Sequence, residues 1–111
     1  MAYYTVLYSM PVEGLSEWMQ KPESERKESE DKMKGKWDAW LAQHRDAIKN
    51  TIALGKTMRA TKDGATTAMN GMMLSSYVEA ESLEAAAAIF KSHPHLQIPG
   101  AVIEIMEARQ L

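Results

Sequence analysis

The sequence predicts an α+β fold in which four strands form one antiparallel sheet with helices on one face. Strand-like runs occur at residues 3–8, 57–61, 72–80 and 101–106, with helical patterns after the first and third of them. This β-α-β-β-α-β order is the ferredoxin-like arrangement. A chain of 111 residues has room for a single core, so residues 1–111 are expected to form one domain.

The first strand is the run YYTVLY, which is rich in aromatic and β-branched residues and lies just before Pro11. Its alternate side chains are apolar or amphipathic on both faces: Tyr4 points one way and Tyr3 the other. Two helices cover only one face of such a sheet. We therefore expect a homodimer in which the uncovered faces pack sheet to sheet.

The segment after this strand predicts a short helix at 13–20 and a long helix from Pro22 to about Ala53. Residues 22–36 are almost wholly charged with both signs mixed, which predicts a solvated helical extension. An apolar stripe at helical spacing follows and predicts the face toward the sheet: Met33, Trp37, Trp40, Leu41, His44, Ile48 and Ile52. Gly35 is a candidate break in this helix, and Gly55 is its expected end.

The second half of the chain predicts a strand at 57–61, a turn at 62–64 and a strand at 72–80 after the turn signal Asn70-Gly71. Ser82 is expected to cap a helix that runs to about Lys91. Pro94 prevents that helix from continuing, and the closing strand follows at 101–106.

The composition excludes several classes of function. The formal net charge is −2, so no general field attracts nucleic acid. The chain has no cysteine, which removes disulfides, thiol nucleophiles and cysteine-rich zinc sites. The apolar run at residues 1–10 is too short to span a bilayer and is poorly formed as a secretory signal. We expect a soluble, cytoplasmic protein with no membrane or nucleic-acid partner.

Three histidines are the main candidates for chemistry. His44 lies on the apolar stripe, where desolvation favours the neutral imidazole that can act as a base. His93 and His95 flank Pro94, but the predicted topology does not bring them together with His44, and a usual zinc site requires a third ligand. No metal site is therefore predicted. A structural role as a helix stop and return loop also accounts for most of this segment.

No phosphate-binding glycine loop, dinucleotide fingerprint or serine-hydrolase motif is present. The C-terminal third instead resembles the YCII-related (DGPF-type) domains, in its strand 77–80, its capped SLEA helix start at 82–85 and its closing strand 102–105. The opening strand 3–8 is similar as well. This resemblance implies a dimeric α+β barrel.

Members similar to YCII itself use a histidine of the first helix with an aspartate after the first strand, a dyad typical of hydrolases. The resemblance places His44 approximately at that histidine. This chain has Ser9-Met10-Pro11 where the aspartate is expected, and Asp63-Gly64 near the place of the DGPF motif. The hydrolase dyad is therefore incomplete.

We expect a homodimer with a small-molecule pocket between sheet and helices, which requires no cofactor; whether the pocket is catalytic stays open. His44 is the candidate base, and the candidate ligand-binding residues are Tyr8, Trp40, Tyr77, His93 and His95. One alternative is a non-catalytic interaction or regulatory module that uses the charged helix. Another is a cofactor-independent oxygenase of the dimeric α+β barrel class.

Overall fold

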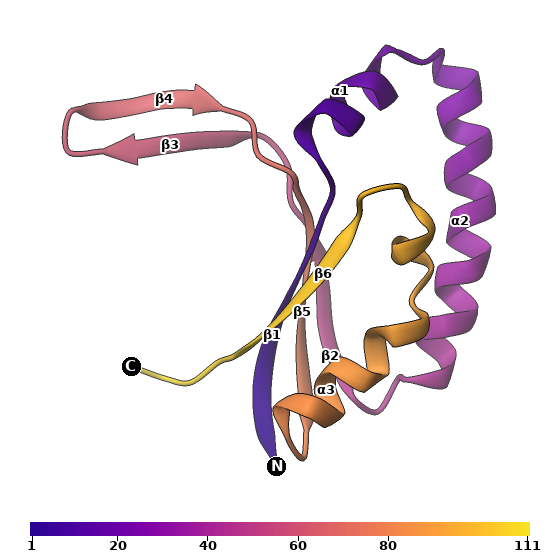
Figure 1. The fold of residues 1–111 in the computed structure, drawn as a ribbon, viewed down its shortest axis with the longest axis vertical. Coiled ribbons are helices and arrows are strands. Elements are labelled where there is room, and N and C mark those ends of the chain that lie inside the picture. The colour runs from indigo at the N-terminus through magenta and orange to yellow at the C-terminus, as the bar shows by residue number, and fades with distance from the viewer.

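The computed structural model, which describes residues 1–111, has a four-stranded antiparallel sheet in the order β2-β5-β1-β6 (Figure 1). The elements in chain order are β1 (Ala2–Ser9), α1 (Val12–Gln20), α2 (Glu23–Gln43), β2 (Ile48–Ala53), β3 (Thr57–Thr61), β4 (Gly64–Ala68), β5 (Met72–Ala80), α3 (Leu83–Ile89) and β6 (Val102–Glu107). The predicted α+β class and four-stranded antiparallel sheet are confirmed. The strand order is compatible with the ferredoxin-like arrangement.

β1 lies at the centre of the sheet, with Tyr4 opposite Val78 of β5 and Val6 opposite Ile105 of β6. Its side chains alternate as predicted, because Tyr4, Val6 and Tyr8 are buried while the residues between them are partly exposed. The buried side chains meet the helices and form the core: Tyr4, Val6, Tyr8, Trp40, Val78, Ala80, Ala86 and Phe90.

The long helix ends ten residues earlier than the sequence analysis expected. α2 runs through Gly35 without a break and stops at Gln43, and residues 48–53 form the edge strand β2. β-branched side chains at Ile48, Thr51 and Ile52 suit a strand, and pairing with β5 satisfies the backbone there. None of the three α-helices is both long and apolar enough to cross a membrane.

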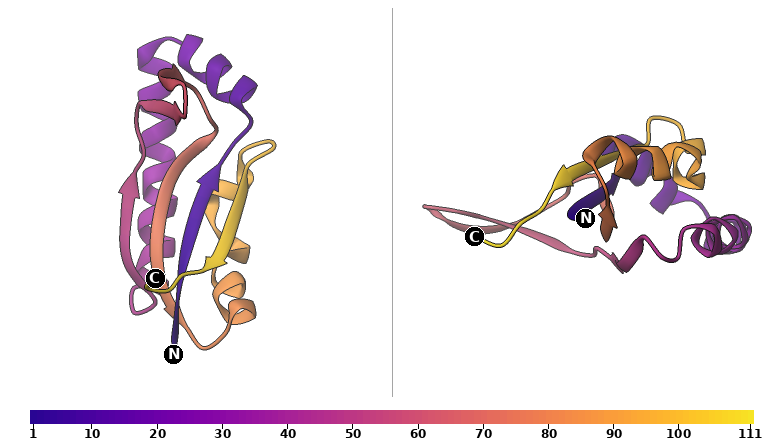
Figure 2. Two further views of the ribbon diagram at one scale, coloured as in Figure 1. Left: turned by 90° about the vertical axis from the view of Figure 1, so that its left-hand side faces the viewer. Right: turned by 90° about the horizontal axis from the view of Figure 1, so that it is seen from below.

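The expected second strand at 57–61 does form, but it lies outside the main sheet. It is β3, which pairs only with β4, and the two build a separate hairpin that we name the arm (Thr57–Ala68). The arm projects from the end of the sheet, on the side opposite α2 (Figures 1 and 2). The strand 48–53, rather than 57–61, is therefore the second strand of the four-stranded sheet in chain order, and it lies at the edge of that sheet.

The segment after β5 follows the prediction more closely. Ser82 caps α3, and its Oγ accepts a hydrogen bond from the Ala85 amide at 3.0 Å. The helix ends at Ile89 and continues as two short 3-10 turns, at Phe90–Ser92 and Pro94–Gln97. Gly100 then adopts a φ of 76°, a conformation that favours glycine, before β6 begins.

One face of the sheet is left uncovered by the helices, which lie behind it in the left view of Figure 2. We name this surface the open face. Five large side chains on it are more than one-third exposed: Tyr3, Ile52, Tyr77, Val102 and Met106. The Tyr3 and Tyr77 rings stack with centroids 5.1 Å apart. The open face thus keeps a substantial apolar surface in water.

Candidate functional site

Six rings from three parts of the chain meet on the helix side of the sheet, at one end of β1. They belong to Tyr8 of β1, to two tryptophans of α2, and to three residues after α3; we name them the aromatic–histidine cluster: Tyr8, Trp37, Trp40, Phe90, His93 and His95. The tryptophans lie three residues apart on α2, so both rings project from one side of the helix. Such a concentration of aromatic and imidazole groups has no equal elsewhere in the chain.

His93 is at the centre of the cluster and is only 1% exposed. Its ring centroid lies 4.2 Å from that of Trp37 and 4.4 Å from that of Trp40, with the planes steeply inclined. Burial lowers the pKa of His93 to about 4, with smaller contributions from the charges of His95 and His44. His93 is therefore a neutral imidazole at physiological pH.

Hydrogen bonds define the protonation of both cluster histidines. His93 Nδ1 accepts from the backbone amide of His95 at 2.9 Å, so the proton of its neutral ring lies on Nε2. His95 Nε2 lies 2.9 Å from the carbonyl oxygen of Ser9, which can only accept, so this nitrogen carries a proton as donor. These contacts bind the loop after α3 to the end of β1.

A chain of hydroxyl groups extends from the cluster across the sheet. Tyr8 Oη lies 2.7 Å from Ser76 Oγ, which lies 2.8 Å from Thr51 Oγ1. Burial raises the pKa of the Tyr8 phenol, and the hydrogen bond with Ser76 lowers it by a smaller amount. The phenol therefore stays protonated and is held in place by the sheet.

Two buried ring nitrogens in the cluster have no hydrogen-bond partner: Trp40 Nε1 and His93 Nε2. Both are donors, since indole carries its proton at Nε1 and the His93 proton lies on Nε2. A buried donor without a partner costs about 1–3 kcal/mol, so such groups in native proteins call for an explanation. An acceptor oxygen that reached either nitrogen would satisfy that donor.

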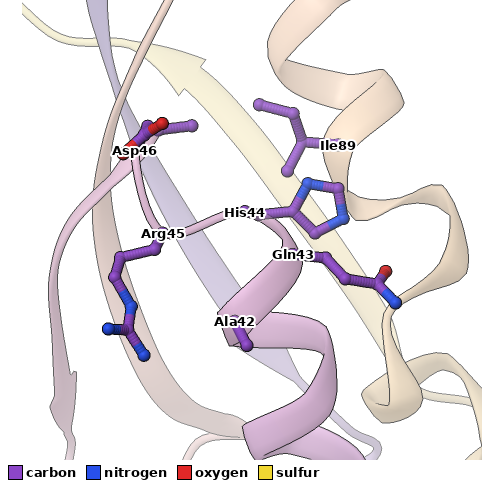
Figure 3. Close-up of a pocket in the computed structure, with 7 residues that line it drawn as sticks. Ala42, Gln43, His44, Arg45, Asp46 and Ile89 are labelled. Atoms are coloured by element: carbon purple, nitrogen blue, oxygen red, sulfur yellow. The ribbon is translucent and has the colours of Figure 1, made fainter.

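His44 is the C-cap residue of α2 and stands at the rim of the cluster, with its ring centroid 4.7 Å from that of Trp40. It is half-buried, and its ring points toward Ile89 at the mouth of an open hollow of about 630 Å³ (Figure 3). Arg45 and Asp46 also line this hollow, although the Arg45 side chain points away from His44. A smaller hollow of about 430 Å³ borders the cluster at Phe90.

The fold brings together four of the residues named from the sequence, Tyr8, Trp40, His93 and His95, and adds His44 through its contact with Trp40. Tyr77 does not join them, because it lies on the open face. The role in a helix stop and return loop that was expected for His93 does not describe it fully, because its ring also packs at the centre of the cluster.

Sequence reasoning missed Trp37, Phe90 and Ser76 as parts of the site. The spacing of Trp37 and Trp40 could have signalled the tryptophan pair, because it places both on one side of a helix. Nothing in the sequence around Ser76 distinguishes it from Ser75. No three histidine, aspartate or glutamate side chains are close enough to hold a metal ion.

Comparison with known proteins adds no assignment. No family model matches this chain, and no curated protein matches it either.

Proposed function

We propose that this protein is a homodimer of ferredoxin-like, YCII-related subunits that binds a small molecule at the aromatic–histidine cluster. The observation that carries the proposal is the pair of buried donors without partners, Trp40 Nε1 and His93 Nε2. A ligand with a carbonyl or carboxylate oxygen would pair with them, and an aromatic or apolar body would stack on the surrounding rings.

Acid–base chemistry on the bound molecule fits the histidines around these donors. His44 lines the larger hollow, and its ring also contacts the ring of Trp40 in the cluster. The imidazole ring is the side chain that most often transfers protons as a general acid or base. His93 stays neutral and donates from Nε2, which suits it to hold a ligand oxygen rather than to act as the base.

The dimer is supported by the size of the exposed surface. The isolated chain exposes 8141 Å², whereas a compact monomer of this mass exposes about 6,100 Å². Only 12 of the 111 residues are buried. The excess of about 2,000 Å² per chain is larger than the roughly 800 Å² that each partner contributes to an interface of standard size. The apolar open face supplies the surface for it.

The exposure of α2 favours one second candidate, a non-catalytic interaction module. Trp40 is its only buried residue, and the N-terminal two-thirds of the helix carries charged side chains in solvent. The ion pairs there, such as Lys34 with Asp38 at 2.9 Å, are local i,i+4 pairs that leave the helix free to contact another molecule. A folded chain that binds no small ligand would favour this reading.

Ligand binding by tryptophan fluorescence tests the proposal. The background is Trp18→Phe, which leaves Trp37 and Trp40 as reporters, and the probes are aromatic and aliphatic carboxylates with matched amides and alcohols. Trp40→Phe keeps a ring but removes the donor, and should weaken binding of the selected probe about tenfold or more, since each 1.4 kcal/mol is tenfold.

The matched control is Trp37→Phe, which removes a tryptophan of the same cluster that the two-donor argument does not use. It should change the affinity by about threefold or less. Equal losses in the two variants, or no binding by any probe to the unaltered chain, would contradict a site built on the Trp40 donor.

A further inference from the structure

The arm (Thr57–Ala68) lacks the support that a hairpin of its size normally needs. Its strands pair only with each other, and none of its residues is buried. A two-stranded hairpin by itself is at best marginally stable in water and requires packing against another surface. Figures 1 and 2 show no helix or strand of this chain along its length. The arm is therefore built to meet another molecule.

The two faces of the arm differ in character. Directly opposed residues share a face, so Met58 and Thr67 lie on the same side as Ala60 and Ala65. The other side carries Arg59 and the threonine opposite it. The first side, which we name the apolar side of the arm, includes Met58 at 66% exposure. A flat surface of small and apolar groups is suited to pack closely on another protein.

Charge identifies a second copy of this chain as the fitting partner. The segment 54–71, which holds the arm, contains Lys56, Arg59, Lys62 and a single acidic residue, Asp63, so its net charge is +2. Because the whole chain carries −2, the remainder carries −4. The open face presents Glu104, and also Glu79, which is paired with Lys49 at 3.7 Å. A basic arm beside an acidic body is complementary to another copy of itself.

The geometry supports the same partner. The arm projects from the end of the sheet on the side opposite α2, which is the side of the open face (Figures 1 and 2). The radius of gyration of 15.6 Å exceeds the roughly 13 Å of a compact domain of this length. A second copy related by a two-fold axis would lie against the open face, and each arm would then contact the other subunit.

We infer that the arm packs by its apolar side on a second copy of this chain and clasps the dimer. The inference rests on the proposed homodimer and assigns it a contact that the open face alone does not provide. Two arms, one from each subunit, add to the interface without needing residues from the helices.

The test measures dimer dissociation by light scattering and sedimentation over a range of concentrations. Met58→Asp places a charge on the apolar side, and Thr66→Asp places the same charge on the opposite side of the same hairpin. Met58→Asp should raise the dissociation constant about tenfold or more, and Thr66→Asp about threefold or less. Both variants lower the arm's positive charge equally, so their difference reports the packed side alone.

A second measurement gives direct evidence of contact. The chain has no cysteine, so Met58→Cys and Thr66→Cys each accept one nitroxide label without further changes. The label at position 58 should be immobilised in the dimer and the label at 66 should stay mobile.

The outcomes separate the two proposals. An unaltered chain with the mass of a monomer, 12.4 kDa, would overturn the homodimer and the arm contact together. A dimer that Met58→Asp and Thr66→Asp affect equally, with both labels mobile, would overturn the arm contact and leave the homodimer standing.

Discussion

His93 shows how one residue serves ring packing and backbone hydrogen bonding together. Two tryptophan rings enclose it, and its Nδ1 orders the loop by accepting from the His95 amide. Burial disfavours the charged imidazolium form of His93, because that form loses its hydration. This holds the pKa of His93 near 4. Because the pKa of this buried imidazole is lowered in the folded state, the free energy of unfolding depends on pH.

Acid should destabilise the protein through His93 between about pH 6.5 and pH 4. In this window the unfolded chain binds a proton at the histidine while the folded chain does not, so the free energy of unfolding falls as the pH falls. The loss should total about 2–3 kcal/mol, since one pKa unit corresponds to 1.36 kcal/mol. Urea unfolding at several pH values measures it.

The control for this prediction is a pair of substitutions. His93→Asn keeps an acceptor for the His95 amide but removes the titrating group, so it should flatten the pH dependence in this window. His44→Asn removes a half-buried imidazole at the rim and should leave most of it. If both variants keep the full slope, the acid sensitivity does not come from His93.

At the scale of elements, α3 carries the loop of His93 and depends on its cap. The helix has only seven residues, Leu83–Ile89, so one cap hydrogen bond is a large part of its stability. Ser82→Ala removes the acceptor of the Ala85 amide and should cost about 1 kcal/mol. Thermal unfolding should show a lower midpoint.

Ser16→Ala is the matched control for the cap. Ser16 is exposed in the middle of α1, and its side chain makes no hydrogen bond there. Its replacement should change stability by less than about 0.5 kcal/mol, as for most surface positions. Equal effects of the two substitutions would show that the cap contributes nothing specific.

The elements that sequence could not predict are those that long-range pairing determines. Ile48 and Ile52 are four residues apart, which fits a helix stripe, and no glycine or proline marks the end of α2 near Gln43. Only the pairing with β5, more than twenty residues later, makes this segment a strand. By contrast, the local signals at Ser82 and Pro94 predicted the path of the chain well, because each acts through the backbone next to it.

The candidate site divides along the same line. The two histidines of the loop and the place of Trp40 on the apolar stripe were visible in the sequence, so His93, His95 and Trp40 could be named. Their meeting with Tyr8 depends on the place of β1 beside the loop, and Tyr77 was named because its face was not assigned. The sequence shows which residue types are present. Which of them lie close together can be predicted only when the pairing and register of the strands are known.

For the whole molecule, the open face should control association. Ile52 is half exposed there, and Ile52→Lys should raise the dissociation constant of the proposed dimer about tenfold or more by placing a charge in an apolar interface. Leu41→Lys on α2, which lies on the other side of the sheet, should leave it nearly unchanged. Sedimentation over a range of concentrations distinguishes them, and equal behaviour would exclude the open face as the interface.

The central position of β1 has a consequence for the order in which the protein folds. Its partners on both sides come from the far end of the chain, as the pairs Tyr4–Val78 and Val6–Ile105 show. During synthesis β1 emerges long before either neighbouring strand exists. Until then its apolar side chains are exposed to water or bound by a chaperone. Folding is therefore expected to be slow, and chaperone dependence should decrease in a permuted chain that begins at β5.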